Sequence, residues 1–326
     1  MKKFNNVIKG TLILTTAGIL SKILGFFYRI YLSRCIGAAG MGLFQIVMPA
    51  AGIVFAICSS GIQTAISKFC CDKKNDFLWL ISGLLLSIPT SLILTFIVYT
   101  NADFIATRFI LNEACSSLLK ILSLSFPFAA FHNCINGFYF AKKKTAIPAF
   151  SQLFEQIIRF FAVYIYVTIY ASDGNASVLC AIYSNLFGEI ASFLYCTCAI
   201  FYTFIKSKCN NTHKKSSLMS KIREMFKFSF PLTANRLLMH IFQSAEAVLV
   251  PAQLIVYGLS KSDSVSIYGI LTGMAMPLIL FPTALTNSLA VMLLPAVSEL
   301  NLENNNKSIK STINKCCLLY TSPSPR

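Results

Sequence analysis

The first apolar run, VIKGTLILTTAGILSKILGFFYRIYL (residues 7–32), decides the fold class. A helix rises 1.5 Å per residue, so roughly 20 apolar residues cross the hydrocarbon core of a bilayer. Lys2 and Lys3 precede the run, as in a secretory signal, but the run is too long for one and lacks a small-residue cleavage site. We therefore expect a transmembrane helix that is retained.

Similar runs recur along the whole chain. Hydrophobic residues make up 56% of it and charged residues only 12%, whereas a soluble domain carries about 25% charged residues. We predict an all-α integral membrane protein with about eight transmembrane helices. The predicted spans are residues 7–32, 43–67, 77–99, 116–141, 146–170, 177–204, 229–257 and 265–298.

Basic residues gather in alternate loops between these spans. The positive-inside rule then places the N-terminus in the cytoplasm. The same rule explains the net charge of +16, because five separate short segments share that charge. Nucleic-acid binding is not needed to account for it, and attraction to anionic lipid headgroups is a secondary effect. The external loops hold only Arg34, Arg108 and Lys261. The cytoplasmic segments hold Lys2, Lys3, Lys9, Lys68, Lys73, Lys74, Lys142, Lys143, Lys144, seven basic residues from Lys206 to Lys227, Lys307, Lys310 and Lys315.

An internal repeat divides the chain. Residues 42–68 and 269–299 share the order Gly, Met-Pro and Ala-(Ile/Val)-Ser-(Lys/Glu). Both spans run toward the cytoplasm, which predicts a parallel repeat about an axis along the membrane normal. We expect a six-helix lobe (1–204), a basic cytoplasmic linker (205–228) and the first two helices of a second lobe (229–315). The ending 316–326 resembles read-through of a sequencing adapter, so we expect the natural chain to continue after about Lys315.

Enzymatic and metal chemistry lack a sequence signal. Most of the twelve cysteines lie within apolar runs without CxxC spacing, and three histidines are too few for a metal cluster. There is no nucleophile-base arrangement and no glycine loop that could hold a phosphate. We expect no enzyme, no cofactor and no metal.

Charged residues inside the predicted spans cost several kcal/mol each on insertion scales, so each is a functional hypothesis. Positive charges outnumber negative ones among them. They are Lys22, Arg29, Lys120, Glu155, Arg159, Glu189, Arg236 and Glu246.

Helical periodicity at about 100° per residue groups several of these side chains. Gln152, Glu155 and Arg159 share one face of span five, and Arg236 lies on a polar stripe of span seven with Glu246 at its edge. Such stripes predict a hydrated cavity lined by spans one, five, six and seven. Two alternatives stay open: Arg29 and Lys120 could reach the headgroups, and Glu155 with Arg159 could be a structural ion pair. The predicted substrate-binding residues are Lys22, Arg29, Gln152, Glu155, Arg159, Arg236 and Glu246.

A net positive cavity of low dielectric constant favours anions. Arginine also matches phosphate oxygens with two parallel hydrogen bonds. An anionic, phosphate-bearing substrate is therefore expected.

Four segments resemble a known family: SKILGFFYRI (21–30), SGIQTAISK (60–68), PAFSQLFEQIIR (148–159) and YGILTGMAMP (268–277). They are similar to the stage V sporulation protein B branch of polysaccharide exporters, in the multidrug/oligosaccharidyl-lipid/polysaccharide superfamily. The resemblance covers nearly the whole chain to about residue 315. It implies two six-helix lobes, usually with two further helices, and alternating access in a bacterial cytoplasmic membrane. The implied substrates are undecaprenyl-pyrophosphate-linked sugars, including peptidoglycan precursors.

The resemblance also carries individual residues. Lys22 falls where related lipid II flippases have a basic residue in their first span, and Arg29 lies one position from their next. Those flippases place an arginine before the Phe-Pro of span eight, whereas MPLILFP (276–282) has no base here. The particular sugar stays open.

Two other functions are weighed beside the flippase. A cation-coupled drug exporter of the same superfamily would need a carboxylate in span one or seven, where only Glu246 is present. A non-transporting membrane scaffold is the second alternative. The chain has no nucleotide-binding motif, so transport would draw on a coupling ion or on consumption of the product.

Overall fold

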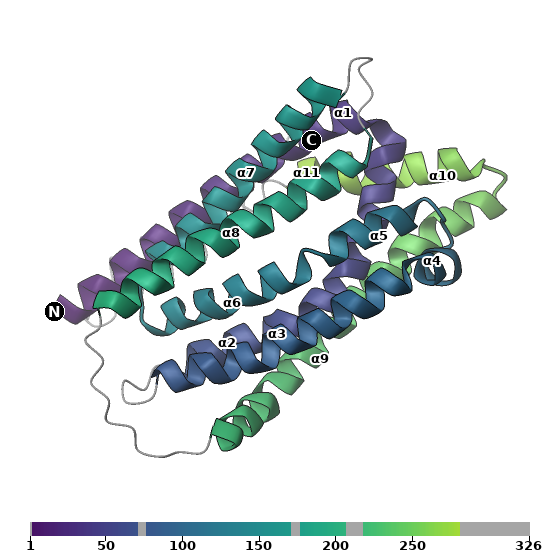
Figure 1. Cartoon of the computed structure of the whole chain (residues 1–326). Coiled ribbons are helices and arrows are strands. Elements are labelled where there is room, and N and C mark those ends of the chain that lie inside the picture. Colours follow the sequence, from purple (N-terminus) through teal and green to yellow (C-terminus); the bar gives the residue numbers. More distant parts are fainter. Residues whose placement is uncertain (1, 71–75, 171–176, 207–217, 281–326) are drawn as a thin grey trace, which may run out of the picture.

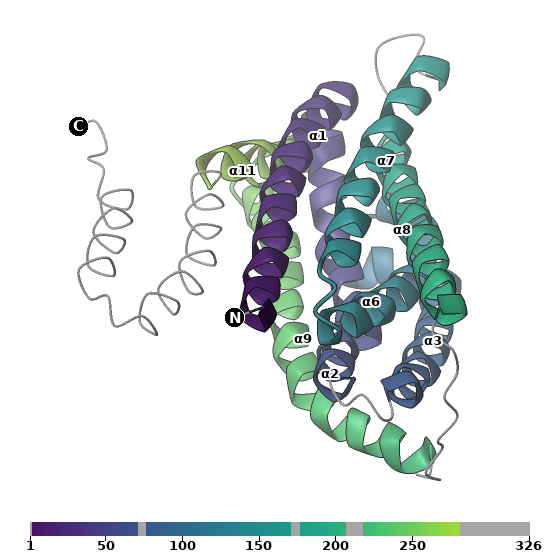
Figure 2. The ribbon, with the colours of Figure 1, turned by 90° about the vertical axis from the view of Figure 1, so that its left-hand side faces the viewer.

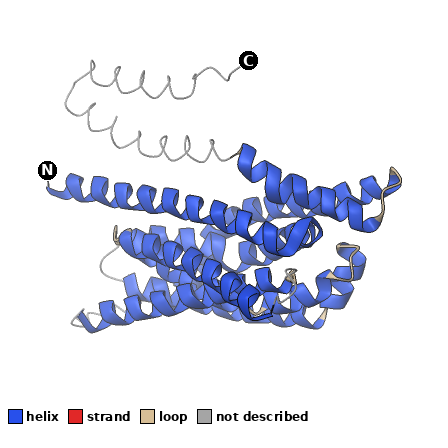
Figure 3. Ribbon diagram, turned by 90° about the horizontal axis from the view of Figure 1, so that it is seen from above, coloured by secondary structure: helices blue, strands red, loops and turns tan. Residues whose placement is uncertain are grey.

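The computed structural model describes residues 2–70, 76–170, 177–206 and 218–280. Within these ranges the regular structure is helical, and Figure 3 shows no strand among them. Large apolar side chains are exposed on the outer helix faces; Phe96, for example, is 70% exposed. So much exposed apolar surface suits lipid rather than water. The predicted all-α membrane fold is confirmed.

The first two predicted spans form two helical arms joined by a sharp reversal of the chain. Helix α1 (Lys2–Phe55) continues through a π-helical turn, η1 (Ala56–Ser60), into α2 (Gly61–Phe69). The chain reverses at Gly37, where φ is 67° and ψ is −177° (Figure 1, purple). Glycine adopts such a positive φ without steric cost. Spans 7–32 and 43–67 therefore lie on either side of Gly37.

The next two spans follow the predicted limits closely. Helix α3 (Asp76–Thr100) leads into the short α4 (Ala102–Phe104) and η2 (Ile105–Phe109). Helices α5 (Cys115–Ser123) and α6 (Phe126–Ala141) then meet at a bend of 45°. A proline stands at the start of α6, where a missing N–H costs nothing, so the predicted span 116–141 is broken at that point.

The remaining elements run from α7 to α11, and two of the predicted segments among them differ from the structure or extend beyond its described residues. Helix α9 begins inside the segment 205–228 that we predict as a linker, so residues 218–228 are helical. The predicted span 265–298 is described only as far as residue 280, and the tail 316–326 lies outside the described residues. These elements are α7 (Ala146–Tyr170), α8 (Leu179–Lys206), α9 (Leu218–Val256), α10 (Lys261–Tyr268), η3 (Gly269–Ala275) and α11 (Met276–Ile279).

Five of the described helices are long and apolar enough to cross a membrane, or six if α5 and α6 form one bent span. The first of the five, Thr16–Phe69, contains the reversal at Gly37. The count of eight stays a prediction because the last predicted span runs past the described residues. The division into two lobes stays a prediction as well.

The helices pack in a bundle (Figures 1 and 2). Helices α1, α7 and α8 run side by side, α6 lies between α8 and the pair α2 and α3, and α9 crosses α1, α2 and α3. At one end of the bundle, Phe69 of α2 stacks on Trp79 of α3 with ring centroids 4.5 Å apart. The face of α7 that meets α1 carries the polar residues described below.

Two glycines allow the part of α1 after Gly37 to pack closely against α10 and η3. A Cβ atom on Gly269 would lie 2.8 Å from the Cα of Gly42, and a Cβ on Gly42 would lie 2.7 Å from Cγ1 of Val265. Neither position has room for a side chain. Gly42 and Gly269 are also the residues that open the two copies of the sequence repeat.

Candidate functional site

A cavity of about 460 Å³ lies between α1, α7 and the α11 end of the described chain. The predicted residues Lys22, Arg29, Gln152 and Arg159 all line it. Among the described residues in its wall there are three cationic side chains and no acidic one. The described wall therefore carries positive side chains without acidic ones, and its role in binding stays a prediction.

Helix geometry explains how these side chains meet. Lys22 and Arg29 share a face of α1, and Gly25 between them faces α7, where a Cβ would lie at an ordinary contact distance of 3.7 Å from Oε1 of Gln156. Ser21 also lines the cavity and is only 4% exposed. Its Oγ has no hydrogen-bond partner within the described part of the chain, so it is available to a ligand.

Arg159 links the cavity to a buried polar cluster behind it. Its Nη2 lies 2.5 Å from Oε1 of Glu155, one helical turn away on α7, and 3.0 Å from Oε1 of Glu189 on α8. Ser192 donates a hydrogen bond of 3.3 Å to the other oxygen of Glu155. The predicted Glu155–Arg159 ion pair is thus present, and Arg159 lines the cavity as well.

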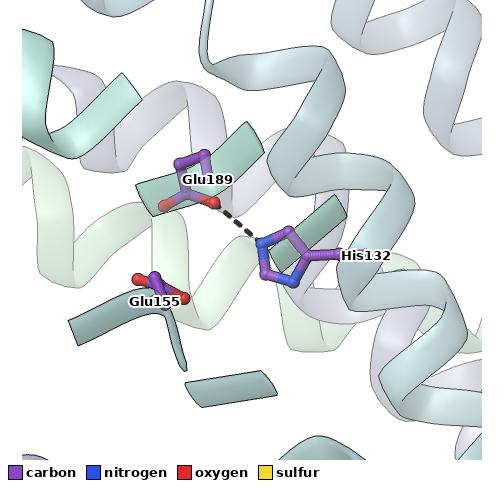
Figure 4. A group of neighbouring side chains, drawn as sticks. All are labelled: His132, Glu155 and Glu189. Atoms are coloured by element: carbon purple, nitrogen blue, oxygen red, sulfur yellow. Dashed lines mark hydrogen bonds and ion pairs between the residues drawn. The ribbon is translucent and has the colours of Figure 1, made fainter. Parts of the chain in front are cut away.

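The polar cluster behind Arg159 also contains a histidine. Nε2 of His132, on α6, lies 2.8 Å from Oε2 of Glu189 (Figure 4). His132 and Glu189 are 6% and 7% exposed, and Asn136 lies 3.4 Å from Nδ1 of the imidazole. We call His132, Glu155 and Glu189 the acid–histidine cluster.

Comparison with known proteins identifies the family to which the chain belongs. Residues 7–301 match the sequence model described as "Polysaccharide biosynthesis protein". The chain belongs to this family. Stage V sporulation protein B of Bacillus subtilis (strain 168) is 28% identical over 300 residues, which are 90% of this chain and 58% of that protein. Lipid II flippase MurJ of the same organism is 23% identical, covering 95% of this chain and 61% of the relative.

These relatives confirm the resemblance carried by the four sequence segments. The chain spans about three fifths of the length of the curated relatives it matches. Solved structures share the fold: MATE in complex with MaD5 aligns with a TM-score of 0.63 at 15% identity, over 95% of this chain and 70% of that one. A MOP superfamily transporter from Pyrococcus furiosus Vc1 (DSM3638) aligns with a TM-score of 0.61 at 13% identity, over 97% and 70%. The chain is a multi-pass membrane protein of the polysaccharide biosynthesis family.

In this family member, two predicted site residues lie away from the cavity. Arg236 is exposed on α9, and its Nη1 donates a hydrogen bond of 3.3 Å to the carbonyl oxygen of Ser60. Glu246 is exposed further along α9. Neither is among the residues that line the cavity. Their role in binding stays a prediction.

Lys120 lies away from the cavity lining and pairs with an acid of α4. Its Nζ lies 2.8 Å from Oδ2 of Asp103, and Ser116 donates a hydrogen bond to Oδ1. The hydrogen bonds from Lys120 and Ser116 lower the pKa of Asp103. This pair is well separated in sequence and structure from the cavity.

His132 is not among the predicted site residues, and Glu189 is predicted as a charged residue within a span, without a binding role. The signal for both was available, because an ionisable side chain within an apolar span is itself a hypothesis of function. The contact between them could not be predicted from sequence, since the two residues lie on α6 and α8 and meet only through packing of these helices.

The acid–histidine cluster has the spacing that a cation would need, with one ligand atom from each residue within 4.8 Å of the others. Arg159, however, already contacts both carboxylates. A metal ion placed there would lie beside the guanidinium and be repelled by it. We therefore assign no metal to this cluster.

Proposed function

We propose that this protein moves an anionic lipid-linked oligosaccharide, of the undecaprenyl-pyrophosphate type, across the bacterial cytoplasmic membrane by alternating access. The observation that carries the proposal is the cavity wall, with three cations and no acid among its described residues. The names of two relatives, stage V sporulation protein B and lipid II flippase MurJ, support the same class of substrate.

The cavity has the chemistry for a pyrophosphate headgroup. Arg29 can present two parallel N–H groups to phosphate oxygens, Lys22 adds a point charge, and Arg159 lines the cavity with a guanidinium whose Nη2 is held by Glu155 and Glu189. The free hydroxyl of Ser21 and the amide of Gln152 can bind further phosphate or sugar oxygens. A volume of about 460 Å³ suits a headgroup, because ligand pockets usually measure about 300–1,000 Å³. The polyprenyl chain would stay in the bilayer.

We infer that the headgroup enters from the cytoplasmic side, with the N-terminus in the cytoplasm as the loop charges predict. The two predicted lobes, 1–204 and 229–315, would then rock to open the cavity outward. The partners in this scheme are the lipid-linked sugar, membrane lipids and a possible coupling ion.

Binding of a polyprenyl pyrophosphate to the purified chain in lipid nanodiscs tests the proposal. Lys22→Ala should weaken binding roughly tenfold or more, since a hydrogen bond to a charged group contributes about 1.5–3 kcal/mol. Lys120→Met is the matched control, because it removes a cation far from the cavity, and should leave affinity unchanged. Equal affinity for Lys22→Ala and the unaltered chain would remove the cationic cavity from the mechanism.

The same nanodiscs separate the drug-exporter alternative. A lipophilic cation should bind weakly, because the described cavity wall offers no carboxylate. Tight binding of such a cation, with no binding of the pyrophosphate, would favour the exporter. Flipping of a labelled lipid-linked sugar by the protein, with and without Lys22→Ala, then tests transport itself.

A further inference from the structure

Arg159 belongs to two sites at once. Its side chain lines the cavity, while its Nη2 lies within 3.0 Å of carboxylate oxygens from both Glu155 and Glu189. Charge that neutralises the guanidinium from behind reduces the positive potential that it presents to the cavity. The electrostatic state of the acid–histidine cluster therefore affects anion binding in front of it.

The charges of the cluster do not balance when His132 is neutral. Two carboxylates and one guanidinium then leave one negative charge, shared among side chains that are between 8% and 19% exposed. Unbalanced charge is costly in so buried a place. One added proton makes the cluster neutral, and the 2.8 Å contact between Nε2 of His132 and Oε2 of Glu189 can hold it (Figure 4).

Within the described part of the chain, the charged groups close to the imidazole are those of the cluster and Arg159. The charged groups that face His132 are Glu155 and Arg159 from α7 and Glu189 from α8. The remaining titratable groups at the edge are Cys196 of α8, whose Sγ lies 3.5 Å from Oδ1 of Asn136, and Tyr28 of α1, which is hydrogen-bonded to Ser184 at 2.7 Å. These groups are neutral at ordinary pH. Proton uptake thus falls to the cluster itself.

We propose that His132, Glu155 and Glu189 form a proton-binding site that controls, through Arg159, the affinity of the cavity for anions. The inference rests on the proposed anion-binding function and adds its regulation. With the proton bound, the net attraction of the cluster for Arg159 falls and the guanidinium is available to the ligand. With the proton released to solvent, the two carboxylates neutralise Arg159, and only Lys22 and Arg29 face the anion.

Linkage makes this coupling reciprocal: a proton that strengthens anion binding is itself held more tightly when the anion is bound. The step needs no other reactant, since one proton passes from solvent to the cluster and the cluster charge rises by one. Gly188 keeps Arg159 in the shared position, because a Cβ there would lie 2.6 Å from Cγ of Arg159. Protonation and anion binding would then rise together as the pH falls.

Inorganic sulfate is a suitable probe, because it stays dianionic over the range in which histidine titrates, about pH 5–8. Its dissociation constant is measured with the intact chain in nanodiscs across that range. The unaltered chain should bind sulfate at least about fivefold more tightly at the acidic end, the lower limit of typical coupling between linked sites. A dissociation constant that does not change with pH overturns the proton site.

Two variants should abolish the pH dependence of sulfate binding, one by keeping the affinity high and the other by keeping it low. Glu155→Gln makes the cluster neutral without a proton, so its affinity at about pH 8 should equal that of the unaltered chain at about pH 5. His132→Gln removes the acceptor that titrates in this range, so affinity should stay low throughout. His240→Gln on α9 is the matched control and should keep the original profile. Thermal unfolding of each variant shows that it is folded.

The outcomes distinguish the two proposals. Sulfate binding with the same pH profile in Glu155→Gln and the unaltered chain overturns the proton site and leaves the anion cavity in place. If neither sulfate nor the polyprenyl pyrophosphate binds at any pH, the proposed function fails, and the inference fails with it.

Discussion

Helices α7 and α9 carry the same sequence signal, an arginine and a glutamate on an otherwise apolar span, but in the fold the two signals meet different surroundings. On α7, Arg159 and Glu155 are covered by α8 and lie beside Glu189. On α9, Arg236 and Glu246 are exposed. Periodicity therefore tells which residues share a face, whereas only the neighbouring helix decides whether that face becomes an interior.

The sharpest test of this comparison removes one acid from each region. Glu189→Ala should lower the free energy of unfolding by about 2–6 kcal/mol, because the buried Arg159 and His132 both lose a hydrogen-bond partner, at roughly 1–3 kcal/mol each, while Arg159 keeps Glu155 as its counter-charge. Glu246→Ala, the same change on the exposed stripe, should stay within about 0.5 kcal/mol. Denaturant unfolding in mild detergent measures both. Equal losses for the two variants would mean that α7 and α9 do not differ in the way described.

A smaller effect is expected where α8 makes room for Arg159. Gly188→Ala places a Cβ 2.6 Å from Cγ and 2.8 Å from Nε of that side chain. Overpacking of this kind costs about 1–3 kcal/mol, and Arg159 would have to leave its two carboxylates. Gly18→Ala is the control, since no atom lies within 4 Å of its added Cβ. It should be neutral or stabilising by up to about 1 kcal/mol, and a loss as large as that of Gly188→Ala would contradict the crowding.

The smallest effect on stability is expected for the exposed pair of Lys120 and Asp103. Lys120→Met should raise the pKa of Asp103 toward its ordinary value, because the hydrogen bond from Lys120 is the main cause of the lowered pKa. A lowered pKa stabilises the fold above the pKa of the unfolded state, and this contribution is lost as the pH falls through the folded pKa. At neutral pH the change in stability should be too small to measure, as for many exposed pairs. Carboxyl NMR titration measures the pKa, and an unchanged pKa would exclude the pair as its cause.

Much of the fold could be predicted because hydropathy is a local property. Predicted spans 77–99 and 146–170 match α3 and α7 within one residue at each end. The start of α9 was misjudged because its basic residues suggested a solvated linker. In the structure Lys221 is 5% exposed, with Nζ 5.1 Å from the ring centroid of Trp79. A lysine whose stem packs on an aromatic ring belongs to a packed helix, and composition cannot show that contact.

The candidate site was predictable to the same degree. Lys22 and Arg29 could be paired on α1 from spacing alone, and the structure adds that Arg159 of α7 meets them in one cavity. His132 and Glu189 could not be paired, because their contact depends on how α6 packs against α8. Helix faces follow from sequence, whereas the meeting of faces is a property of the fold.

The contact between Gly42 and Gly269 has a further consequence. The two residues open the two copies of the sequence repeat. Gly42 lies against Val265, four residues before Gly269, and Gly269 lies against Ala38, four residues before Gly42. Reciprocal contacts, in which residue i meets j and the equivalent of j meets i, characterise an isologous interface between two identical subunits related by a twofold axis. A single polypeptide makes this contact here. The glycine pair thus makes, within one chain, the kind of reciprocal contact that a homodimer interface makes between two chains.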